Sequence, residues 1–343
     1  MTKHRLFWPV VALLALLLGD LVAQPSFFSI ELRDGHLYGN LVDILKNGAP
    51  LILIAIGMTV VVATRGIDLS VGAVVAISGA LACLWISEHP DGVGTTLVAV
   101  GLALGLSLVL GVWNGWLVAA LGIQPIIATL ILMVAGRGIA QLITGGQIIT
   151  INSGRYEWIG SGFVLTLPSA ILIALAVFAL ASVLVRRSAL GLLVEAVGGN
   201  PEASRLAGVR SARLTWLVYV FCALCAGIAG LMISANVHSA DGNNAGQFIE
   251  LDAILAVVIG GTQLTGGRFS LGGSVIGALL IQTLTTTVYA LGIPPQAIML
   301  FKALVVLAVC LLQSGKFREK FRRGRRAEAP TAAGEPQKVE VGV

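Results

Sequence analysis

The chain has 343 residues, of which 57% are hydrophobic and 11% are charged, and its mean hydropathy is +0.93. Ordinary soluble domains carry about 25% charged residues, so this composition excludes a soluble globular protein and indicates an integral membrane protein. Almost no chain remains for a separate catalytic domain.

Apolar runs along the chain are interpreted as membrane spans, because a helix needs about 20 mostly apolar residues to cross a bilayer. The ten runs are 7–23, 41–64, 68–87, 95–121, 124–144, 165–185, 213–235, 251–264, 271–291 and 296–314. We therefore predict an all-α polytopic fold in which residues 7–314 form one transmembrane domain of about ten helices. The breaks at 64–68 and 264–271 are short enough to be re-entrant kinks within the membrane.

The first run has two interpretations. Lys3 and Arg5 precede it and Leu21–Ala23 loosely resembles a cleavage site, which is the pattern of a signal peptide. The many spans that follow favour an uncleaved first helix instead. Residues 1–6 would then form a short cytoplasmic N-terminus.

Basic residues are distributed unevenly over the connecting segments. With the N-terminus inside, 17 of the 22 Lys and Arg residues lie in inner segments, and only Arg33, Lys46 and Arg155 lie outside. Cytoplasmic loops carry the excess of Lys and Arg in membrane proteins. Both termini and the loop 186–212 are therefore predicted to be cytoplasmic, and the net charge of +5 reflects orientation rather than nucleic-acid binding. The tail 315–343 reads as a basic inner-leaflet anchor followed by disorder.

Two segments 200 residues apart share the pattern G-x-x-x-S-[VL]-G, one from Gly66 to Gly72 and one from Gly266 to Gly272. Internal repeats and interrupted helices are typical of transporters, although chance similarity between two glycine-rich turns is the alternative. Asp68 in the first copy corresponds to Arg268 in the second. We hypothesise that these two side chains pair across a pseudo-symmetric interface.

Several polar residues lie within the predicted spans or beside them. A charge inside the membrane is costly, so Arg137 is expected to face a wet cavity or an acidic partner, and Lys302 an interior ion pair. Asn114 and Thr129 have side chains that donate and accept hydrogen bonds, which suits either a polyhydroxylated substrate or bonding between helices. Glu250 is placed on the outer face with Asp252, where both would be solvated or would dock a soluble delivery protein.

Pairs of glycines four residues apart let helices approach closely. The pairs are Gly101 and Gly105, Gly111 and Gly115, and Gly273 and Gly277. We interpret them first as packing devices.

The segment 195–209 is a polar island between two long apolar runs, and it contains signals for a complete short helix. Asn200 is a favourable N-cap, Pro201 suits the first helical position, and Gly208 suits the left-handed position after the helix. These residues predict a helix of about two turns, roughly 10 Å long. An isolated helix that short is only marginally stable in water, so we expect contacts with other parts of the protein to stabilise it. A short capped helix on the inner face is what a cytoplasmic motor would need as its contact on a membrane protein.

Other chemical motifs are missing from the sequence. The four cysteines fall in apolar runs, and the Cys222-x-x-Cys225 pair has neither a second pair nor a nearby histidine, so we predict neither a metal site nor a cofactor. No phosphate-binding loop of the form G-x-x-x-x-G-K-[ST] and no hydrolase motif occurs. The chain is therefore not predicted to be an enzyme, and any ATP-driven work requires a separate subunit.

Three motifs resemble the ribose-type permeases of bacterial ABC importers, over about residues 8–314. They are Gly66-Ile-Asp-Leu-Ser-Val-Gly72, the Glu195–Val209 island and Leu255-Ala-Val-Val-Ile-Gly-Gly261. The resemblance is strongest to permeases of galactofuranose importers, through Ala128–Gly138 and Asn243–Gly246. Arg65 stands where the family usually has Gly.

The resemblance implies an inner-membrane permease that pairs with an identical or different second permease. Its other partners would be an ATP-binding cassette subunit and a periplasmic sugar-binding protein, and the sugar would be galactofuranose or one resembling ribose or galactose. The family assigns the 195–209 island to the helix that couples the ATPase to the membrane spans.

We accordingly predict a permease subunit that imports a monosaccharide by alternating access. The predicted ATPase-coupling residues are Glu195, Gly198, Asn200, Ala203, Arg205 and Gly208. The predicted pathway or hinge residues are Gly66, Asp68, Ser70, Gly72, Asn114, Thr129, Arg137, Gly260, Gly261 and Arg268. The alternative is an ion-coupled secondary transporter using Asp20, Asp68, Asp252, Arg137 and Lys302, and composition alone also allows a scaffold or receptor.

Overall fold

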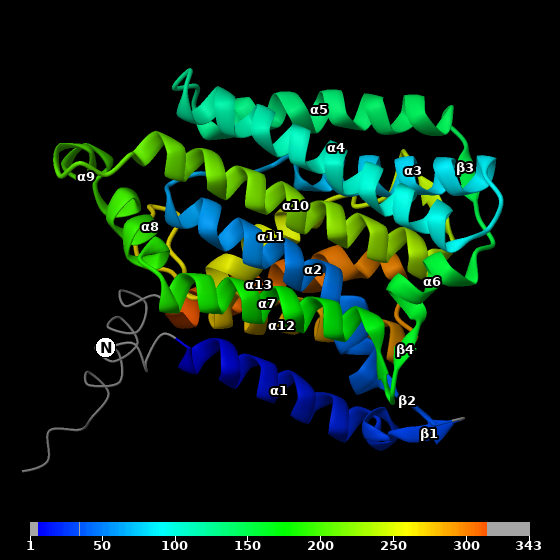
Figure 1. Cartoon of the computed structure of the whole chain (residues 1–343). Helices are drawn as coiled ribbons and strands as arrows, with labels where there is room; N and C mark the ends of the chain where they lie inside the picture. Colours follow the sequence, from blue (N-terminus) through cyan, green and yellow to red (C-terminus); the bar gives the residue numbers. More distant parts are fainter. Residues whose placement is uncertain (1–5, 34, 314–343) are drawn as a thin grey trace, which may run out of the picture.

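The computed structural model describes residues 6–33 and 35–313, so residues 1–5 and the predicted tail 315–343 lie outside the described part. Long helices dominate that part and run roughly side by side (Figure 1). The longer helices are α1 (Phe7–Ala23), α2 (Asn40–Ala63), α3 (Val71–Glu88), α4 (Val93–Ala119), α5 (Pro125–Thr144), α7 (Ser169–Arg187), α10 (Ser211–Val237), α11 (Ile249–Ile259), α12 (Leu271–Ala290) and α13 (Ile298–Gln313). The shorter ones are α6 (Gly154–Ser161), α8 (Leu190–Gly199), α9 (Pro201–Leu206) and the 3₁₀ turns η2 (Pro25–Phe28) and η3 (Pro295–Ala297).

Between residues 6 and 313, apart from the undescribed residue 34, six short strands form three antiparallel pairs. They are β1 (Glu31–Arg33) with β2 (His36–Tyr38), β3 (Ile148–Thr150) with β6 (Ser239–Asp241), and β4 (Phe163–Val164) with β5 (Leu167–Pro168). These pairs lie at one end of the molecule, and α8 and α9 lie at the other (Figure 1). We call these the strand end and the α9 end.

The centre of the molecule is built around α2 and α10. Helix α2 is buried continuously from Gly48 to Ala63, as expected of a helix that is apolar on every side. It packs against α10, α12, α7 and α11, while α10 also packs against α3 and α4. Helices α4, α5 and α7 lie at the periphery and expose many Leu, Ile and Val side chains. Such apolar outer faces fit a lipid environment.

Each predicted span corresponds to a helix, and the all-α membrane fold is confirmed. In the described part of the chain, seven helices are long and apolar enough to cross a membrane: α2, α3, α4, α5, α7, α10 and α12. Helices α1, α13 and α11 are shorter, with 17, 16 and 11 residues. Ten crossings therefore remain a prediction, as do the positions of the termini.

The predicted span 251–264 is wrong in length, because α11 ends at Ile259. Gly260 and Gly261 follow, and Gly261 has a φ of 84°, which stops the helix. The segment before α11 packs against α3, since a side chain at Gly246 would contact Val75 and the Gly72 carbonyl.

The two glycine motifs occupy equivalent places in the fold. Helix α3 begins at Val71 and α12 at Leu271, so the offset of 200 residues is kept. Each helix follows a loop, and the two loops meet at the α9 end, where the Gly267 amide donates to the Ala63 carbonyl at 2.8 Å. The local geometry agrees with a repeat, while a repeat of the whole chain stays a prediction.

Candidate functional site

Helix α9 begins and ends at the residues that the sequence indicated. The Asn200 side chain accepts a hydrogen bond from the Ala203 amide at 3.0 Å, and Pro201 is the first helical residue. Gly208 has a φ of 86°, and the Val209 amide donates to the Ser204 carbonyl at 2.9 Å. This is a Schellman-type ending, so the predicted capped short helix is confirmed.

The surface of α9 is largely uncovered. Within α9, Ser204 is buried, while Ala203 and Arg205 are exposed and Leu206 is 83% exposed. Helix α9 packs against α8 and α10, and it projects from the end of the bundle (Figure 1). A single exposed Leu is unremarkable on its own, but here it lies on a capped helix beside a basic side chain. Leu206 is a candidate contact that the sequence analysis missed.

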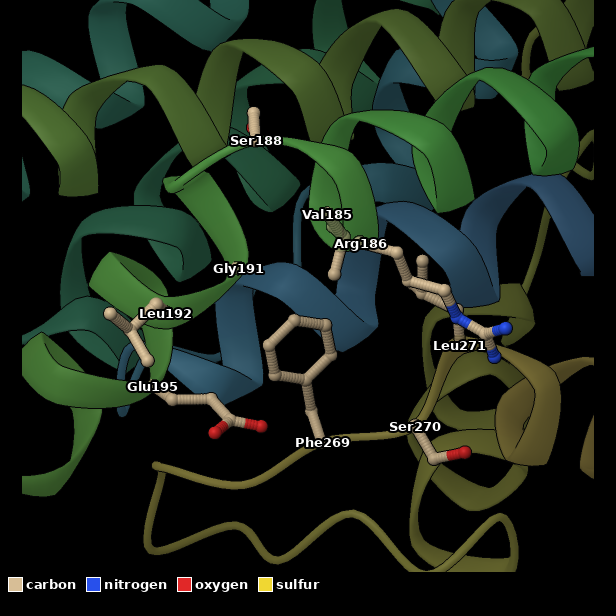
Figure 2. Close-up of a pocket in the computed structure, with 9 residues that line it drawn as sticks. All are labelled: Val185, Arg186, Ser188, Gly191, Leu192, Glu195, Phe269, Ser270 and Leu271. Carbon is tan, nitrogen blue, oxygen red and sulfur yellow. The ribbon is translucent and has the colours of Figure 1, made fainter.

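Glu195 belongs to α8, not to α9, and lines a cavity of about 380 Å³ at the α9 end. The other lining residues include Arg186 from the end of α7 and Phe269 from the loop before α12. Figure 2 shows the Phe269 ring between the Glu195 carboxylate and the Arg186 guanidinium. Gly198 is buried at the end of α8, where a side chain would contact the Ala63 carbonyl and the Gly267 amide.

A second group of predicted residues meets at the start of α3. Asp68 is 1% exposed and accepts hydrogen bonds from the Ser70 amide at 3.0 Å and the Ser70 hydroxyl at 2.6 Å. The Asn114 amide nitrogen donates to the same hydroxyl at 2.8 Å. Thr129 donates to the Ile67 carbonyl at 3.2 Å. Residues from the α2–α3 loop, α4 and α5 are thus joined in one buried polar cluster.

The hypothesised Asp68–Arg268 ion pair is wrong. Arg268 is exposed at the α9 end, whereas Asp68 is buried and bonded to Ser70. The two positions correspond in sequence, but one side chain is exposed and the other is buried. Gly66 lies beside Tyr219 of α10, since a side chain at Gly66 would contact the tyrosine hydroxyl.

Gly72, Arg137 and Glu250 meet next to this cluster. A side chain at Gly72 would contact the Glu250 carboxylate and would lie 3.3 Å from an Arg137 nitrogen. Arg137 donates to the Ala245 carbonyl at 2.5 Å, and Glu250 acts on it electrostatically. Glu250 is thus an acidic neighbour of Arg137, but the two side chains form no ion pair in the described part of the chain. The expectation that Glu250 lies in a solvated outer loop is wrong, because it is 7% exposed in the first turn of α11.

Three of the buried polar atoms that lack a hydrogen-bond partner in the described residues border this region. They are Asn114 Oδ1, Tyr219 Oη and Glu250 Oε2. Burying an unsatisfied polar atom is costly, and native proteins keep few of them. Their concentration around the start of α3 marks it as a candidate for function. Tyr219 was missed as a site residue, and Glu250 was placed on the outer face, because only packing brings these two side chains to α3.

A cavity of about 300 Å³ extends along α3 toward the strand end. Residues of α3, of α10 and of the segment after β6 line it, including Ser234, Asp241 and Asn244. Asp241 accepts hydrogen bonds from the Asn243 amide at 2.8 Å and the Asn244 side chain at 2.7 Å. Partial burial alone would raise the pKa of Asp241, but these bonds and Arg137 outweigh it and hold that pKa below its ordinary value.

The remaining residues singled out in the sequence contribute to helix packing, to an ion pair or to a hydrogen bond. Gly260 packs on the backbone of Gly273, which brings α11 close to α12, and Gly261 ends α11. Lys302 forms the expected interior ion pair, with Asp252 at 2.6 Å. Asp20 accepts a hydrogen bond from Thr287 at 2.9 Å. The acids of the secondary-transporter alternative thus bond to different partners in different places.

The family model for the branched-chain amino acid transport system / permease component matches residues 40–310. The galactofuranose transporter permease protein YtfT of Escherichia coli is 50% identical over 320 residues, which cover 92% of this chain and 93% of that protein. The fructose import permease protein FruF of Bifidobacterium longum is 39% identical, with 96% and 95% covered. The ribose import permease protein RbsC of Escherichia coli is 36% identical, with 90% and 93% covered.

No solved structure matches the chain. The family model and these full-length relatives cover the helices that carry both the capped helix and the buried polar cluster. The chain therefore belongs to the family of permease components typified by the branched-chain amino acid transport system.

Proposed function

We propose that this chain is the membrane-spanning permease subunit of an inner-membrane ABC importer for a monosaccharide, and that the sugar is galactofuranose. The relatives are named as permeases for galactofuranose, fructose and ribose, which supports the sugar class. The relative with 50% identity favours galactofuranose. The chain itself is a transport component and supplies no catalytic site.

The observation that carries the proposal is the exposed helix α9. It is capped at both ends, it projects from the end of the bundle (Figure 1), and it exposes Leu206 and Arg205. A partner subunit with an apolar groove and acidic rim would bind such a helix in the groove-binding manner. The sequence has no phosphate-binding loop, so ATP would have to be bound by another subunit, and an ATP-binding cassette subunit is the partner proposed for α9.

Charge supports the orientation that this proposal needs. Among the described residues, the basic side chains at the α9 end are Arg65, Arg186, Arg187, Arg205, Arg210, Arg213 and Arg268, and those at the strand end are Arg33, Lys46 and Arg155. The excess of basic residues belongs in the cytoplasm. The α9 end would face the ATPase, and the strand end would face the binding protein.

The buried cluster at the start of α3 and the cavity beside it are the proposed switching region. Asp68, Ser70 and Asn114 join the α2–α3 loop to α4. Arg137 of α5 and Glu250 of α11 both lie beside Gly72 at the start of α3. Nucleotide binding shifts a transporter only if it binds the two states differently. Nucleotide binding would move α9, and this movement would favour one of the two packings of α3, α4, α5 and α11. The nucleotide would then bind the state with that packing more tightly than the other state.

Two experiments test the proposal. The tagged chain is purified from its native membrane in mild detergent, and mass spectrometry identifies what accompanies it. An ATP-binding cassette subunit is expected, and a second permease would show a heterodimer. The purified complex in liposomes should then take up galactofuranose only with ATP and the binding protein. Uptake by the chain alone without ATP would contradict the proposal and favour secondary transport.

A further inference from the structure

Arg65 lies in the α2–α3 loop and adopts a backbone conformation that L-residues avoid. Its φ is 67°, and only three other non-glycine residues in the described part of the chain have a positive φ. A β-carbon is crowded in this region, so such a residue persists only where its surroundings hold it. The positive φ therefore indicates that contacts of the Arg65 side chain hold the residue in this conformation.

That side chain binds the end of α8. The Nε atom donates to the Gly198 carbonyl at 2.6 Å, and Nη2 donates to the Gly199 carbonyl. The last carbonyls of a helix lack partners within the helix, and a cation there is favoured by the helix dipole. The next residue, Asn200, is the N-cap of α9. One guanidinium thus fixes the junction between α8 and α9.

The loop before α12 joins the same contact. A side chain at Gly266 would contact the Arg65 side chain and would lie 3.0 Å from the Gly198 carbonyl. The Gly267 amide donates to the Ala63 carbonyl at 2.8 Å. Three segments that are far apart in sequence therefore meet around Arg65, with glycines where side chains would not fit.

The other side of the loop leads directly to the buried cluster. Asp68 is three residues from Arg65, and it is bonded to Ser70 and through it to Asn114 of α4. Because the loop is short and its two ends are held, a shift of the α8–α9 junction would pull on the start of α3. Arg65 is itself an exposed residue, but its guanidinium is bonded to the α8 carbonyls and not only to water, so the contact can transmit this movement.

We propose that Arg65 is a positioning residue that fastens the α8–α9 junction to the α2–α3 loop and so carries movement of α9 to the buried cluster. It deepens the proposed function and rests on it. Arg65 contacts neither sugar nor nucleotide, and it acts through the backbone of α8 and through the loop that it belongs to.

The test compares Arg65→Gly, Arg65→Gln and Arg65→Lys in the reconstituted complex with its ATPase and binding protein. Arg65→Gly removes the guanidinium but allows the positive φ, so it separates the side-chain contact from backbone strain. We expect the sugar moved per ATP hydrolysed to fall about tenfold in the Gly and Gln variants, the size expected for losing charge-assisted hydrogen bonds. The sugar concentration for half-maximal uptake should not change.

Arg65→Lys should recover part of the coupling, because a lysine keeps the charge but not the fork of donors. The control is Arg33→Gln, which removes an exposed arginine from β1 at the other end of the molecule. Normal sugar transport per ATP in a folded Arg65→Gly complex would overturn the proposal. Absence of ATP-dependent uptake in the wild type would instead contradict the proposed function itself.

A second measurement needs no transport. A spin label on Glu202→Cys, an exposed position of α9, reports the mobility of the helix in the isolated chain. Mobility should increase when Arg65→Gly is added and stay unchanged when Arg33→Gln is added. Equal mobility with and without Arg65→Gly would overturn the proposal even if the Arg65 variants fail to assemble with the other subunits.

Discussion

At the scale of single residues, the polar side chains of the site differ in what they bond. Ser70 is central, because its hydroxyl donates to Asp68 and accepts from Asn114. Some buried hydroxyls bond only to their own helix, as Ser107 does with the Ala103 carbonyl at 2.8 Å. A serine of the cluster therefore bonds side chains from other parts of the chain, whereas a serine such as Ser107 bonds only the backbone of its own helix.

Ser70→Ala should destabilise the chain more than Ser107→Ala. Removing the Ser70 hydroxyl deprives two buried polar groups of a partner, at a cost of about 1–3 kcal/mol in the free energy of unfolding. Ser107 is buried to the same extent, 1% exposed, but only a backbone carbonyl loses a donor. Denaturant unfolding of both variants in detergent measures the difference. Equal losses would show that the Asp68–Ser70–Asn114 bonds are not important for stability.

Gly208→Val should weaken coupling, whereas Gly208→Asn should retain most of it. The position is open, with nothing within 4 Å of an added side chain, so only the φ of 86° distinguishes the two residues. Asn tolerates the left-handed region and a β-branched residue does not, a difference of about 1–2 kcal/mol. The measurement is ATPase stimulation by the sugar-loaded binding protein. Equal stimulation in both variants would show that the left-handed ending of α9 is not required for coupling.

At the scale of elements, glycine decides how closely helices approach. Gly111 and Gly115 of α4 face α10, and Gly273 and Gly277 of α12 face α11, with backbone or side-chain atoms where a β-carbon would be. Gly101 and Gly105 of the same α4 face open space in this chain. Two of the three glycine pairs found in the sequence are therefore confirmed as packing devices within the chain.

Alanine at these positions tests that distinction. Gly111→Ala places a methyl group 2.7 Å from the Ala223 side chain and 2.8 Å from the Val220 backbone, so α4 and α10 must separate. Gly105→Ala adds a methyl group to open space on the same helix and gains helix propensity, about 1 kcal/mol. Thermal unfolding should show a lower Tm for the first variant and an equal or higher Tm for the second. The reverse order would contradict the packing of α4 on α10.

At the scale of the whole molecule, orientation follows from which end carries the basic residues. The α9 end has seven of them among the described residues, and the strand end has three. The proposed function depends on this direction, since the ATPase must reach α9 and the binding protein must reach the strand end.

Labelling an introduced cysteine in intact cells, with the unsubstituted chain and its four native cysteines as the background control, tests the orientation. Leu206 in α9 is 83% exposed and Leu165 between β4 and β5 is 88% exposed, so Leu206→Cys and Leu165→Cys are a matched pair at opposite ends. A membrane-impermeant maleimide added outside should label only the Leu165→Cys variant once the outer membrane is permeabilised. Disrupting the inner membrane should then allow labelling of the Leu206→Cys variant as well. Labelling of Leu206→Cys from outside would invert the topology.

The sequence by itself determined the membrane class, the helix at nearly every apolar run and the complete capping of α9. These depend on local causes: apolar length, the N-cap amide of Asn200 and the positive φ at Gly208 are properties of a few consecutive residues. For the same reason the sequence indicated that Asp68, Ser70 and Gly72 belong together.

Only the tertiary structure decided which residues from different helices meet. It joined Asn114 to Ser70, placed Glu250 beside Arg137 and Gly72, and bonded Arg65 to the end of α8. It also separated Arg268 from Asp68 and shortened α11. Such contacts depend on how helices rotate and pack against one another, and local sequence pattern leaves that rotation open wherever a helix is apolar on every side.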